Sequence, residues 1–533
     1  MNQIAGCENQ KSQIEDRDAK IANHQSPHSP MARLRAEALP LTKEIETLRR
    51  AKARSQDLPI VLGIDVGTSG VRSLAATAEG DVLAEARAGL FDLPAAGAAH
   101  EQDANPWWRA VCQTIKDLRD NLGAGRQWAR IAGIAVTSTS GSLVLTDSQG
   151  EPVRPAMLYD DGRAGAVASE INQRLPTGQV QINASYSLAK ALWVRQQEPS
   201  VWARASYILH PADWLHAKLT GELGICDYSN ALKLGYDQEK SEWTAAVGLA
   251  DIPATMFPRV VAPGDQVGVV SARASEETGL AAGVPVLAAA SDGLASLVGS
   301  GASEPGHANT TLGTTLVWKV LAPTKPRLGP GMYCHHLPND LWVPGAASNT
   351  GPGSLRLEET GVTPAEMDQR AAPHLPTTIQ CYLLGARGER FPFLNPQAMG
   401  FFDRTPASPE EGYAAQLQSL ACVERWGYER LEACGVAVGH IVFSAGSAAA
   451  SPIFSQLRAN LLNRTVVRSA NPTASLGAAI LAASTVLFGG NLTAAIRSMT
   501  RIIESHTPQL EVVEKFETAY RLFRAACMRH GFE

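Results

Sequence analysis

The chain has 533 residues, of which 45% are hydrophobic and 19% are charged, and its formal net charge is −5. This length exceeds what one hydrophobic core usually covers, so we expect two domains of roughly 200 to 250 residues. The slightly acidic balance argues against a nucleic-acid or anionic-membrane partner, and no apolar run approaches the roughly 20 residues of a membrane span. Eight cysteines without a C-x-x-C pair favour a reducing, cytoplasmic compartment over a disulfide framework or a zinc site.

Residues 1–57 differ from the rest of the chain. They are polar and charge-mixed and lack apolar periodicity, so we expect an N-terminal extension that is disordered or helical. From Pro59 onward, short β-branched runs alternate with amphipathic stretches, which is typical of an α/β protein. The first strands run on either side of a turn at Gly67–Gly70, and a second hairpin turn is expected at Glu79–Asp81.

The turn after the first strand has an unusual composition, "DVGTSG" followed by Arg72. Glycine lets a bulky anion approach the main chain, and the hydroxyls of Thr68 and Ser69 add donors. Asp65 suits a divalent cation that bridges phosphate oxygens rather than the phosphate itself. The pattern therefore favours a nucleotide with Mg²⁺, although such turns also close ordinary hairpins.

Other phosphate and metal motifs are missing from the sequence. It contains no Gly-Lys dipeptide and hence no Walker A loop, and no G-x-G-x-x-G opens a helix after a strand. It also lacks H-E-x-x-H, and its turns do not have the G-x-S-x-G spacing of a hydrolase. A nucleotide site must therefore be of another kind.

Further along, a helix "NPWWRAVCQTIKDLRDNLGA" is expected with Asn105 as its N-cap. An apolar strand then leads into Asp292 and a helix, and a strand-turn-strand unit follows at "LGTTLVWKVLA". The Leu312–Thr315 turn repeats the glycine and hydroxyls of the Asp65–Ser69 turn, which suits two structurally related domains. Asp292 by itself is equally typical of a helix N-cap.

These segments, in this order, resemble the FGGY family of carbohydrate kinases over roughly residues 59–485, and are most similar to its D-ribulose kinase and xylulose kinase-like branch. The segments that carry the resemblance are "GIDVGTSGVR", "SYSLAKALWV", "DYSNA", "AAASDGLASLVG", "TTLGTT", "GERFPFLNPQAMGFF" and "SLGAAILAA". The resemblance implies two actin-like (ribonuclease H-like) α/β domains, at residues 58–302 and 303–533, with a catalytic cleft between them. ATP, Mg²⁺ and a small sugar would meet there, and the sequence leaves open a homodimer.

The resemblance also assigns site residues. Asp292 is the expected catalytic base, and Asp65, Ser140 and Asp292 would contact the sugar, with Asp65 also on the Mg²⁺ side. Nucleotide and phosphate binding would fall to a larger set: Gly67, Thr68, Ser69, Arg72, Gly313, Thr314, Thr315, Gly446 and Ser447. Asp161 with Arg163, and also Lys190, suit an internal structural role as well as a substrate contact.

Two departures from the family pattern bear on specificity. Gly446-Ser447-Ala448 stands where the family usually has consecutive glycines, which predicts weakened or reshaped nucleotide binding. Ser138-Thr139-Ser140-Gly141 stands where xylulose kinases have Gly-Gln-Met-His-Gly. Exchanging an imidazole for a hydroxyl alters hydrogen bonding to substrate oxygens, so we rank D-ribulose first and D-xylulose second. A non-catalytic sugar or nucleotide sensor and an actin-like assembling protein remain as alternatives on the same fold.

Overall fold

The computed structural model describes residues 58–94, 97–123, 125, 127–176, 181–357 and 361–533. The predicted N-terminal extension, residues 1–57, lies outside the described residues. Pro59–Glu533 forms one compact unit.

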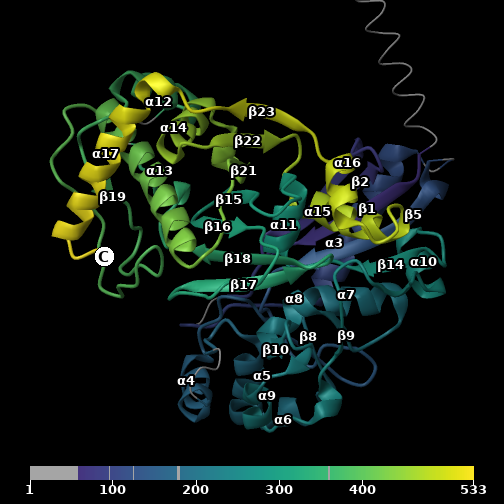
Figure 1. The fold of residues 1–533 in the computed structure, drawn as a ribbon. Coiled ribbons are helices and arrows are strands. Elements are labelled where there is room, and N and C mark those ends of the chain that lie inside the picture. Colours follow the sequence, from purple (N-terminus) through teal and green to yellow (C-terminus); the bar gives the residue numbers. More distant parts are fainter. Residues whose placement is uncertain (1–57, 95–96, 124, 126, 177–180, 358–360) are drawn as a thin grey trace, which may run out of the picture. The chain divides into compact units, whose positions relative to one another are not determined.

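A six-stranded mixed sheet forms the first half of this unit (Figure 1), in the order β13-β14-β5-β1-β2-β3. Its strands are β1 (Ile60–Val66), β2 (Gly70–Thr77), β3 (Val82–Gly89), β5 (Ile131–Ser138), β13 (Gln266–Val269) and β14 (Pro285–Ala288). The chain enters through the antiparallel strands β1, β2 and β3, and β5 and β14 then add parallel to β1 on its other side. The expected hairpin turn at Glu79–Asp81 joins β2 to β3.

The second half contains a seven-stranded sheet in the order β17-β18-β16-β15-β21-β22-β23. Its strands are β15 (Ala308–Leu312), β16 (Leu316–Val320), β17 (Met332–Leu337), β18 (Leu341–Ala347), β21 (Ile441–Ala445), β22 (Thr465–Ser469) and β23 (Ile502–His506). An antiparallel hairpin, β15 and β16, again comes first, and β21 and β22 add parallel to β15. The two halves thus share a five-strand arrangement, β2-β1-β5-β14-β13 in one sheet and β16-β15-β21-β22-β23 in the other, and the predicted repeat of the Asp65–Ser69 turn at Leu312–Thr315 is confirmed as the first hairpin of each sheet.

Two helices pack between the sheets, α11 (Asp292–Ser300) and α15 (Ala474–Val486), as Figure 1 shows. Their backbones approach very closely: a Cβ atom added at Gly477 would lie 1.8 Å from the carbonyl oxygen of Ala295. A Cβ atom at Gly63 of β1 would lie 1.9 Å from the carbonyl oxygen of Ser475. Neither site has room for a side chain, so glycine at these positions lets α15 pack closely on β1 and lets α11, which begins at Asp292, pack closely on α15.

Further helices cover the outer faces of the sheets and fill an insertion between β5 and β13. The longer ones are α3 (Asn105–Leu122), α4 (Gly165–Arg174), α5 (Ser187–Gln197), α7 (Pro211–Thr220), α12 (Pro364–Ala371), α13 (Pro409–Ala433), α14 (Pro452–Leu462), α16 (Leu492–Met499) and α17 (Leu510–Arg529). The shorter ones are α6 (Pro199–Trp202), α8 (Tyr228–Ala231), α9 (Ala245–Ala250) and α10 (Ala272–Thr278). Short strand pairs complete the fold: β4 (Glu101–Gln102) with β7 (Ala156–Met157), β6 (Val144–Thr146) with β8 (Tyr207–Leu209), β9 (Ile225–Asp227) with β12 (Arg259–Val261), β10 (Tyr236–Asp237) with β11 (Glu242–Trp243), and β19 (Cys381–Tyr382) with β20 (Phe401–Phe402).

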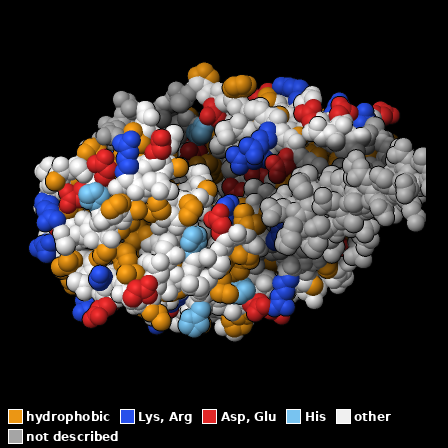
Figure 2. Space-filling view, turned by 90° about the horizontal axis from the view of Figure 1, so that it is seen from above, with side chains coloured by type: hydrophobic (Ala, Val, Ile, Leu, Met, Phe, Trp, Pro, Cys, Tyr) orange, Lys and Arg blue, Asp and Glu red, His pale blue; other side chains and the backbone are white. Residues whose placement is uncertain are grey.

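The predicted α/β class with two related halves is therefore confirmed. The chain crosses from one sheet to the other between α11 and β15, and we propose that the domain division at 302/303 lies there. The seven cysteines within the described residues are free thiols. None of the helices in the described part of the chain is long and apolar enough to cross a membrane. On the face shown in Figure 2, Lys and Arg side chains are interspersed with acidic and hydrophobic ones.

Candidate active site

Three predicted site residues follow neighbouring parallel strands of the first sheet. Asp65 lies near the end of β1, Ser140 lies two residues beyond β5, and Asp292 follows β14 as the first residue of α11. Register brings the strand ends together, since Asp65 pairs with Thr137 of β5. In open α/β sheets, ligands bind outside the carboxyl ends of the strands, which is where these side chains lie.

Asp65 and Asp292 lie close enough for their charges to interact. Burial, and then the charge of Asp292, raise the pKa of the Asp65 carboxyl to about 7, whereas Arg72 opposes the shift. Arg72 is the cross-strand neighbour of Asp65 on β2. Burial also raises the pKa of Asp292, whose Oδ1 accepts a hydrogen bond of 2.7 Å from the Gly293 amide. Two carboxylates in a poorly solvated place favour a cation or a proton between them.

The "DYSNA" segment fixes the chain just before Asp292. The Asp227 carboxylate accepts hydrogen bonds from the Ser229 and Asn230 amides at 2.8 and 3.2 Å, which caps α8. The Ser229 hydroxyl oxygen in turn accepts the Ser291 amide at 2.9 Å. Asp292 is the first helical residue and Ser291 is the N-cap, so a buried relay that starts at Asp227 fixes the backbone directly before Asp292.

The turn that carries Ser140 is held from behind by a buried lysine. Lys190 donates hydrogen bonds to the carbonyl oxygens of Gly141 at 2.8 Å and Leu158 at 2.6 Å. Gly141 has a φ of +86°, which favours glycine. The Ser140 hydroxyl oxygen is buried and has no hydrogen-bond partner among the described residues. Lys190 is therefore a structural support, and Ser140 presents an unpaired polar atom, as a ligand contact would.

The Gly67–Gly70 turn is closed by its own backbone. The Gly67 amide donates to the Gly70 carbonyl at 3.0 Å, and Gln102 Nε2 donates to the Thr68 carbonyl at 2.6 Å. The hydroxyls of Thr68 and Ser69 make no hydrogen bond to another described residue. The hydroxyl donors of this turn are thus available to a ligand.

The corresponding turn of the second sheet lies beside Gly446. The Gly313 amide donates to the Thr315 carbonyl at 3.3 Å, and Thr314 and Thr315 make no side-chain hydrogen bond within the described residues. Gly446, directly after β21, has a φ of +91°, and a Cβ atom there would lie 2.3 Å from the carbonyl oxygen of Leu312. Ser447 then begins a short 3₁₀ helix, Ser447–Ala450. The two predicted phosphate and nucleotide segments of this half therefore adjoin one another.

Comparison with models of known protein families identifies the family of this chain. The N-terminal domain of the FGGY family of carbohydrate kinases matches residues 60–299, and its C-terminal domain matches residues 339–486. The chain belongs to the FGGY family of carbohydrate kinases. It is accordingly a phosphotransferase. This enzyme assignment replaces the alternatives of a non-catalytic sensor and an actin-like assembling protein.

Relatives of this FGGY kinase include xylulose and glycerol kinases. It is 27% identical over 406 residues to a xylulose kinase of Escherichia coli, covering 73% of this chain and 82% of the relative. It is 27% identical over 507 residues to a glycerol kinase of Alkalilimnicola ehrlichii, covering 87% and 98%. A solved xylulose kinase from Rhodospirillum rubrum matches with a TM-score of 0.78 at 25% identity, covering 88% and 98%. Plasmodium falciparum glycerol kinase with ADP, at 17% identity, matches with a TM-score of 0.77 and covers 89% and 98%, which shows the fold alone.

Further polar residues, to which the sequence analysis assigned no role, interact electrostatically with Asp292 or with one another: Lys233, Lys319, Tyr333, His335 and Arg390. Burial lowers the pKa of His335 to about 3, and the charges of Lys233 and Lys319 add to this shift. Lys233 also lies beside the Ser140 turn, since a Cβ atom at Gly141 would be 3.7 Å from Lys233 Cγ. Tyr333 and His335 of β17 thus lie between the Ser140 turn and the Asp292 side. Neither Lys319 nor His335 stands in a recognisable motif, so their role could not be predicted from the sequence.

The "GER" stretch is a buried hydrogen-bond centre in the second half. Glu389 is 2% exposed and accepts hydrogen bonds from the Ser348 hydroxyl at 2.7 Å, the Asn349 amide at 2.6 Å and the Tyr382 hydroxyl at 2.7 Å. The Ser348–Thr350 segment pairs with β16 directly after the Thr314–Thr315 turn, because the Leu316 amide donates to the Thr350 carbonyl at 2.7 Å. Glu389 therefore holds in place the Ser348–Thr350 segment, which lies beside that turn.

Two other polar groups prove to be structural. Asp161 pairs with Arg163 at 2.6 Å, and Glu101 pairs with Arg154 at 2.5 Å, so these groups bind one another.

His210 lies with Asp213 and Cys226 in a buried cluster. Its ring nitrogens already bond Ser187 Oγ at 2.8 Å and Asp213 at 3.0 Å. Both ring nitrogens of His210 are therefore already used within this internal network, whereas Asp213 Oδ1 is buried without a hydrogen-bond partner among the described residues.

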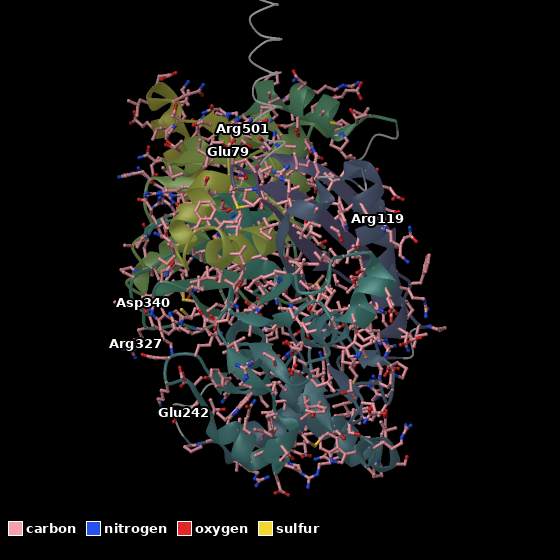
Figure 3. All side chains as sticks on the ribbon, turned by 90° about the vertical axis from the view of Figure 1, so that its right-hand side faces the viewer. Glu79, Arg119, Glu242, Arg327, Asp340 and Arg501 are labelled. Carbon is pink, nitrogen blue, oxygen red and sulfur yellow. The ribbon has the colours of Figure 1, made fainter. Side chains whose placement is uncertain are left out.

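A cavity of about 240 Å³ lies apart from the residues named above. Glu79 and Arg501, which are close together in Figure 3, both line it. The other lining residues are Gly80, Asp81, Val82, Ser469, Ala470, Asn471, Leu476, Met499 and Thr500. None of the predicted site residues lines this cavity.

Proposed function

We propose that this FGGY kinase transfers the terminal phosphoryl group of ATP to a hydroxyl of a ketopentose, with D-ribulose giving D-ribulose 5-phosphate as the leading reaction. D-xylulose is the second candidate, and it is favoured by the similarity to xylulose kinases over most of the chain. The observation that carries the proposal is the carboxylate pair, Asp65 and Asp292, at the carboxyl edge of the first sheet.

Asp292 is the proposed general base. Its carboxylate accepts the proton of the acceptor hydroxyl, whose oxygen then bonds to the terminal phosphorus while the bond to the ADP oxygen breaks. The relay from Asp227 through Ser229 to Ser291 holds the start of α11 in one position. A base that is fixed in this way lowers the entropy lost when the substrate becomes reactive.

Asp65 is the proposed partner of Mg²⁺. Its burial beside a second carboxylate raises its pKa to about 7, and a divalent cation would relieve that repulsion, so the donor set fits a hard cation. When bound, Mg²⁺ would neutralise negative charge on the phosphate oxygens. Arg72 and the unpaired hydroxyls of Thr68 and Ser69 are proposed to bind phosphate beside it.

The second sheet is the proposed nucleotide side. Gly313, Thr314 and Thr315 would bind phosphate oxygens, and Gly446 with Ser447 would approach the adenosine. The close packing of Gly446 on Leu312 supports a single continuous surface for both parts of ATP. A glycerol kinase of the same fold has been solved with ADP, which is consistent with a nucleotide on this scaffold.

Ser140 is the proposed selector of the sugar. D-ribulose and D-xylulose differ only in the configuration at C3, so one hydrogen bond can distinguish them. The buried Ser140 hydroxyl lacks a protein partner, and leaving it unpaired would disfavour the wrong epimer by about 1 to 3 kcal/mol.

The test is ADP release by the purified protein with D-ribulose, D-xylulose, glycerol and gluconate. We expect the highest kcat/KM with D-ribulose and a loss of about 10²- to 10⁴-fold in Asp292→Asn. Full activity in Asp292→Asn would overturn the assignment of the base, and activity with none of the ketoses would overturn the substrate class.

Ser140→Ala should reduce the preference for D-ribulose over D-xylulose about tenfold or more, because it removes the selecting hydroxyl. Ser142→Ala is the matched control in the same turn, since its hydroxyl is paired with Thr139 at 2.9 Å. An unchanged epimer preference in Ser140→Ala would reject Ser140 as the selector.

A further inference from the structure

Lys319 is a nearly buried cation of the second sheet that the residues assigned above leave without a role. It lies in β16, four residues after Thr315, and is 4% exposed. Its neighbour Trp318 belongs to the core on the helix α13 side of the sheet, so Lys319 points to the opposite face. Its cross-strand neighbours are Asn309 on β15 and Gly345 on β18.

That face of the sheet is directed at the helix that begins with Asp292. A Cβ atom added at Gly293 would lie 3.7 Å from Lys319 Nζ, so the ammonium is next to the first turn of α11. The charges of Lys319 and Asp292 act on each other in both directions: burial lowers the pKa of Lys319 to about 8, and Asp292 opposes that shift. Lys319 therefore belongs to the second half of the molecule and reaches the base in the first.

The ammonium has no acceptor of its own. Among the described residues, Lys319 Nζ makes no hydrogen bond or ion pair, not even with Asp292. Two other polar atoms in this region, Asn309 Nδ2 and His335 Nδ1, are fully buried and have no hydrogen-bond partner among the described residues. Buried polar atoms without partners are rare in folded proteins, and a cluster of them beside an unpaired ammonium suits a site that a ligand completes.

The ligand must be an anion, because a desolvated ammonium is stabilised most by negative oxygens. Asp65, Tyr159 and Tyr333 also face Asp292, and none of them supplies a cation there. In the function proposed above, on which this inference rests, the only anion that must arrive beside Asp292 is the phosphoryl group that bonds to the acceptor oxygen.

We propose that Lys319 is a catalytic residue whose ammonium binds an oxygen of the phosphoryl group as that group passes from ATP to the sugar. Asp292 takes the proton of the acceptor hydroxyl, the oxygen–phosphorus bond forms, and the electron pair of the broken bond stays on ADP. Lys319 keeps its three protons throughout and offsets the charge of the transferred group. After transfer it holds the phosphate of the product.

The test measures the binding of the sugar and of its phosphorylated product separately, by calorimetry without ATP, after the substrate panel has identified the sugar. Lys319→Met should bind the unphosphorylated sugar within about twofold of the wild type and the sugar phosphate at least about tenfold more weakly, because only the phosphate contact is lost. Its kcat should fall about 10²-fold or more. Lys319→Arg, which keeps the charge, should retain most of the affinity for the product.

Lys325→Met is the matched control, since Lys325 lies just beyond β16 and pairs on the surface with Glu239 at 2.7 Å. Unchanged product affinity in Lys319→Met would overturn the inference while leaving the kinase proposal intact. An equal loss of sugar and product affinity would also overturn it, because Lys319 would then contact the sugar itself. Lys319→Gln repeats the measurement if the melting curve of Lys319→Met shows that it does not fold. Failure of the wild type to phosphorylate any ketose would instead reject the proposed function.

Discussion

The two sheets share a five-strand arrangement but bring opposite charges to the site. The first sheet brings two carboxyl groups, Asp65 and Asp292, whereas β16 of the second sheet brings the ammonium of Lys319. The first hairpin of each sheet has glycine and hydroxyls at its bend. We propose that the two similar turns of the shared fold both bind phosphate, and that Asp292 and Lys319, which lie outside these turns, divide the acid–base work from the charge neutralisation.

The largest effect on stability is expected from a change at Glu389, the buried hydrogen-bond centre of the second half. Glu389→Ala should lower the free energy of unfolding by about 3 to 5 kcal/mol, because it leaves the Ser348, Asn349 and Tyr382 donors unpaired. Urea denaturation measures this. Glu304→Ala is the control, since Glu304 pairs with Arg497 on the surface and such pairs are worth about 0 to 1 kcal/mol. Similar losses in the two variants would contradict the role given to Glu389.

A second change separates the nucleotide side from the sugar side. Gly446→Ala should destabilise the protein by about 2 kcal/mol and raise KM for ATP several-fold, because the added Cβ meets the Leu312 carbonyl at 2.3 Å. KM for the ketose should stay near the wild-type value. Gly489→Ala is the control: its φ is +60° but nothing lies within 4 Å of the added atom. An equal rise in both KM values would argue against separate sides.

Lys190→Met tests the proposed sugar side, in the first half of the molecule, and should affect the ketose rather than ATP. It removes the hydrogen bonds to the Gly141 and Leu158 carbonyls, so it should destabilise the fold by about 1 to 2 kcal/mol, with part of the loss offset by removal of a buried charge. KM for the ketose should rise, because the Ser140 turn loosens, and KM for ATP should not. Steady-state kinetics with each substrate varied in turn decides the matter, and a rise confined to ATP would refute this account.

The smallest effect is the contribution of the buried Asp292 carboxyl to the stability of the folded protein. Burial raises the pKa of Asp292 in the folded protein, so the unfolded chain releases this proton at a lower pH. The folded state therefore loses stability as pH rises from the ordinary aspartate range through the raised pKa. Asp292→Asn removes this penalty and should stabilise the nucleotide-free, metal-free protein by about 1 kcal/mol at pH 8 and by less at pH 5.

Melting curves in EDTA at the two pH values provide the measurement. Asp340→Asn, an exposed position labelled in Figure 3, is the control and should change the melting temperature little at either pH. If Asp292→Asn were destabilising at pH 8, the buried carboxylate would not be a strained functional group.

Local sequence reasoning was accurate for strands and turns and less so for helix ends. Asn105 was expected as an N-cap, but α3 begins at Asn105 itself and Ala104 occupies the N-cap without a side-chain bond. Asp292 was equally typical of an N-cap, yet Ser291 takes that position. A one-residue shift of this kind depends on the backbone angle at which a strand enters its helix, which local composition does not determine.

By itself the sequence determined the α/β class, the paired hairpins, the kinase family and the residues Asp65, Ser140 and Asp292 at strand ends. The class and the hairpins follow from short-range patterns, because turn chemistry and strand periodicity are encoded by neighbouring residues. The family and its site residues follow instead from the resemblance of several motifs in one order. Only the tertiary structure decided that Lys190 supports the Ser140 turn and that Lys319 faces Asp292. It also decided that Glu389 holds the Ser348–Thr350 segment beside Thr315. Each of these depends on which buried side chain lacks water and which partner the fold brings to it from far along the chain.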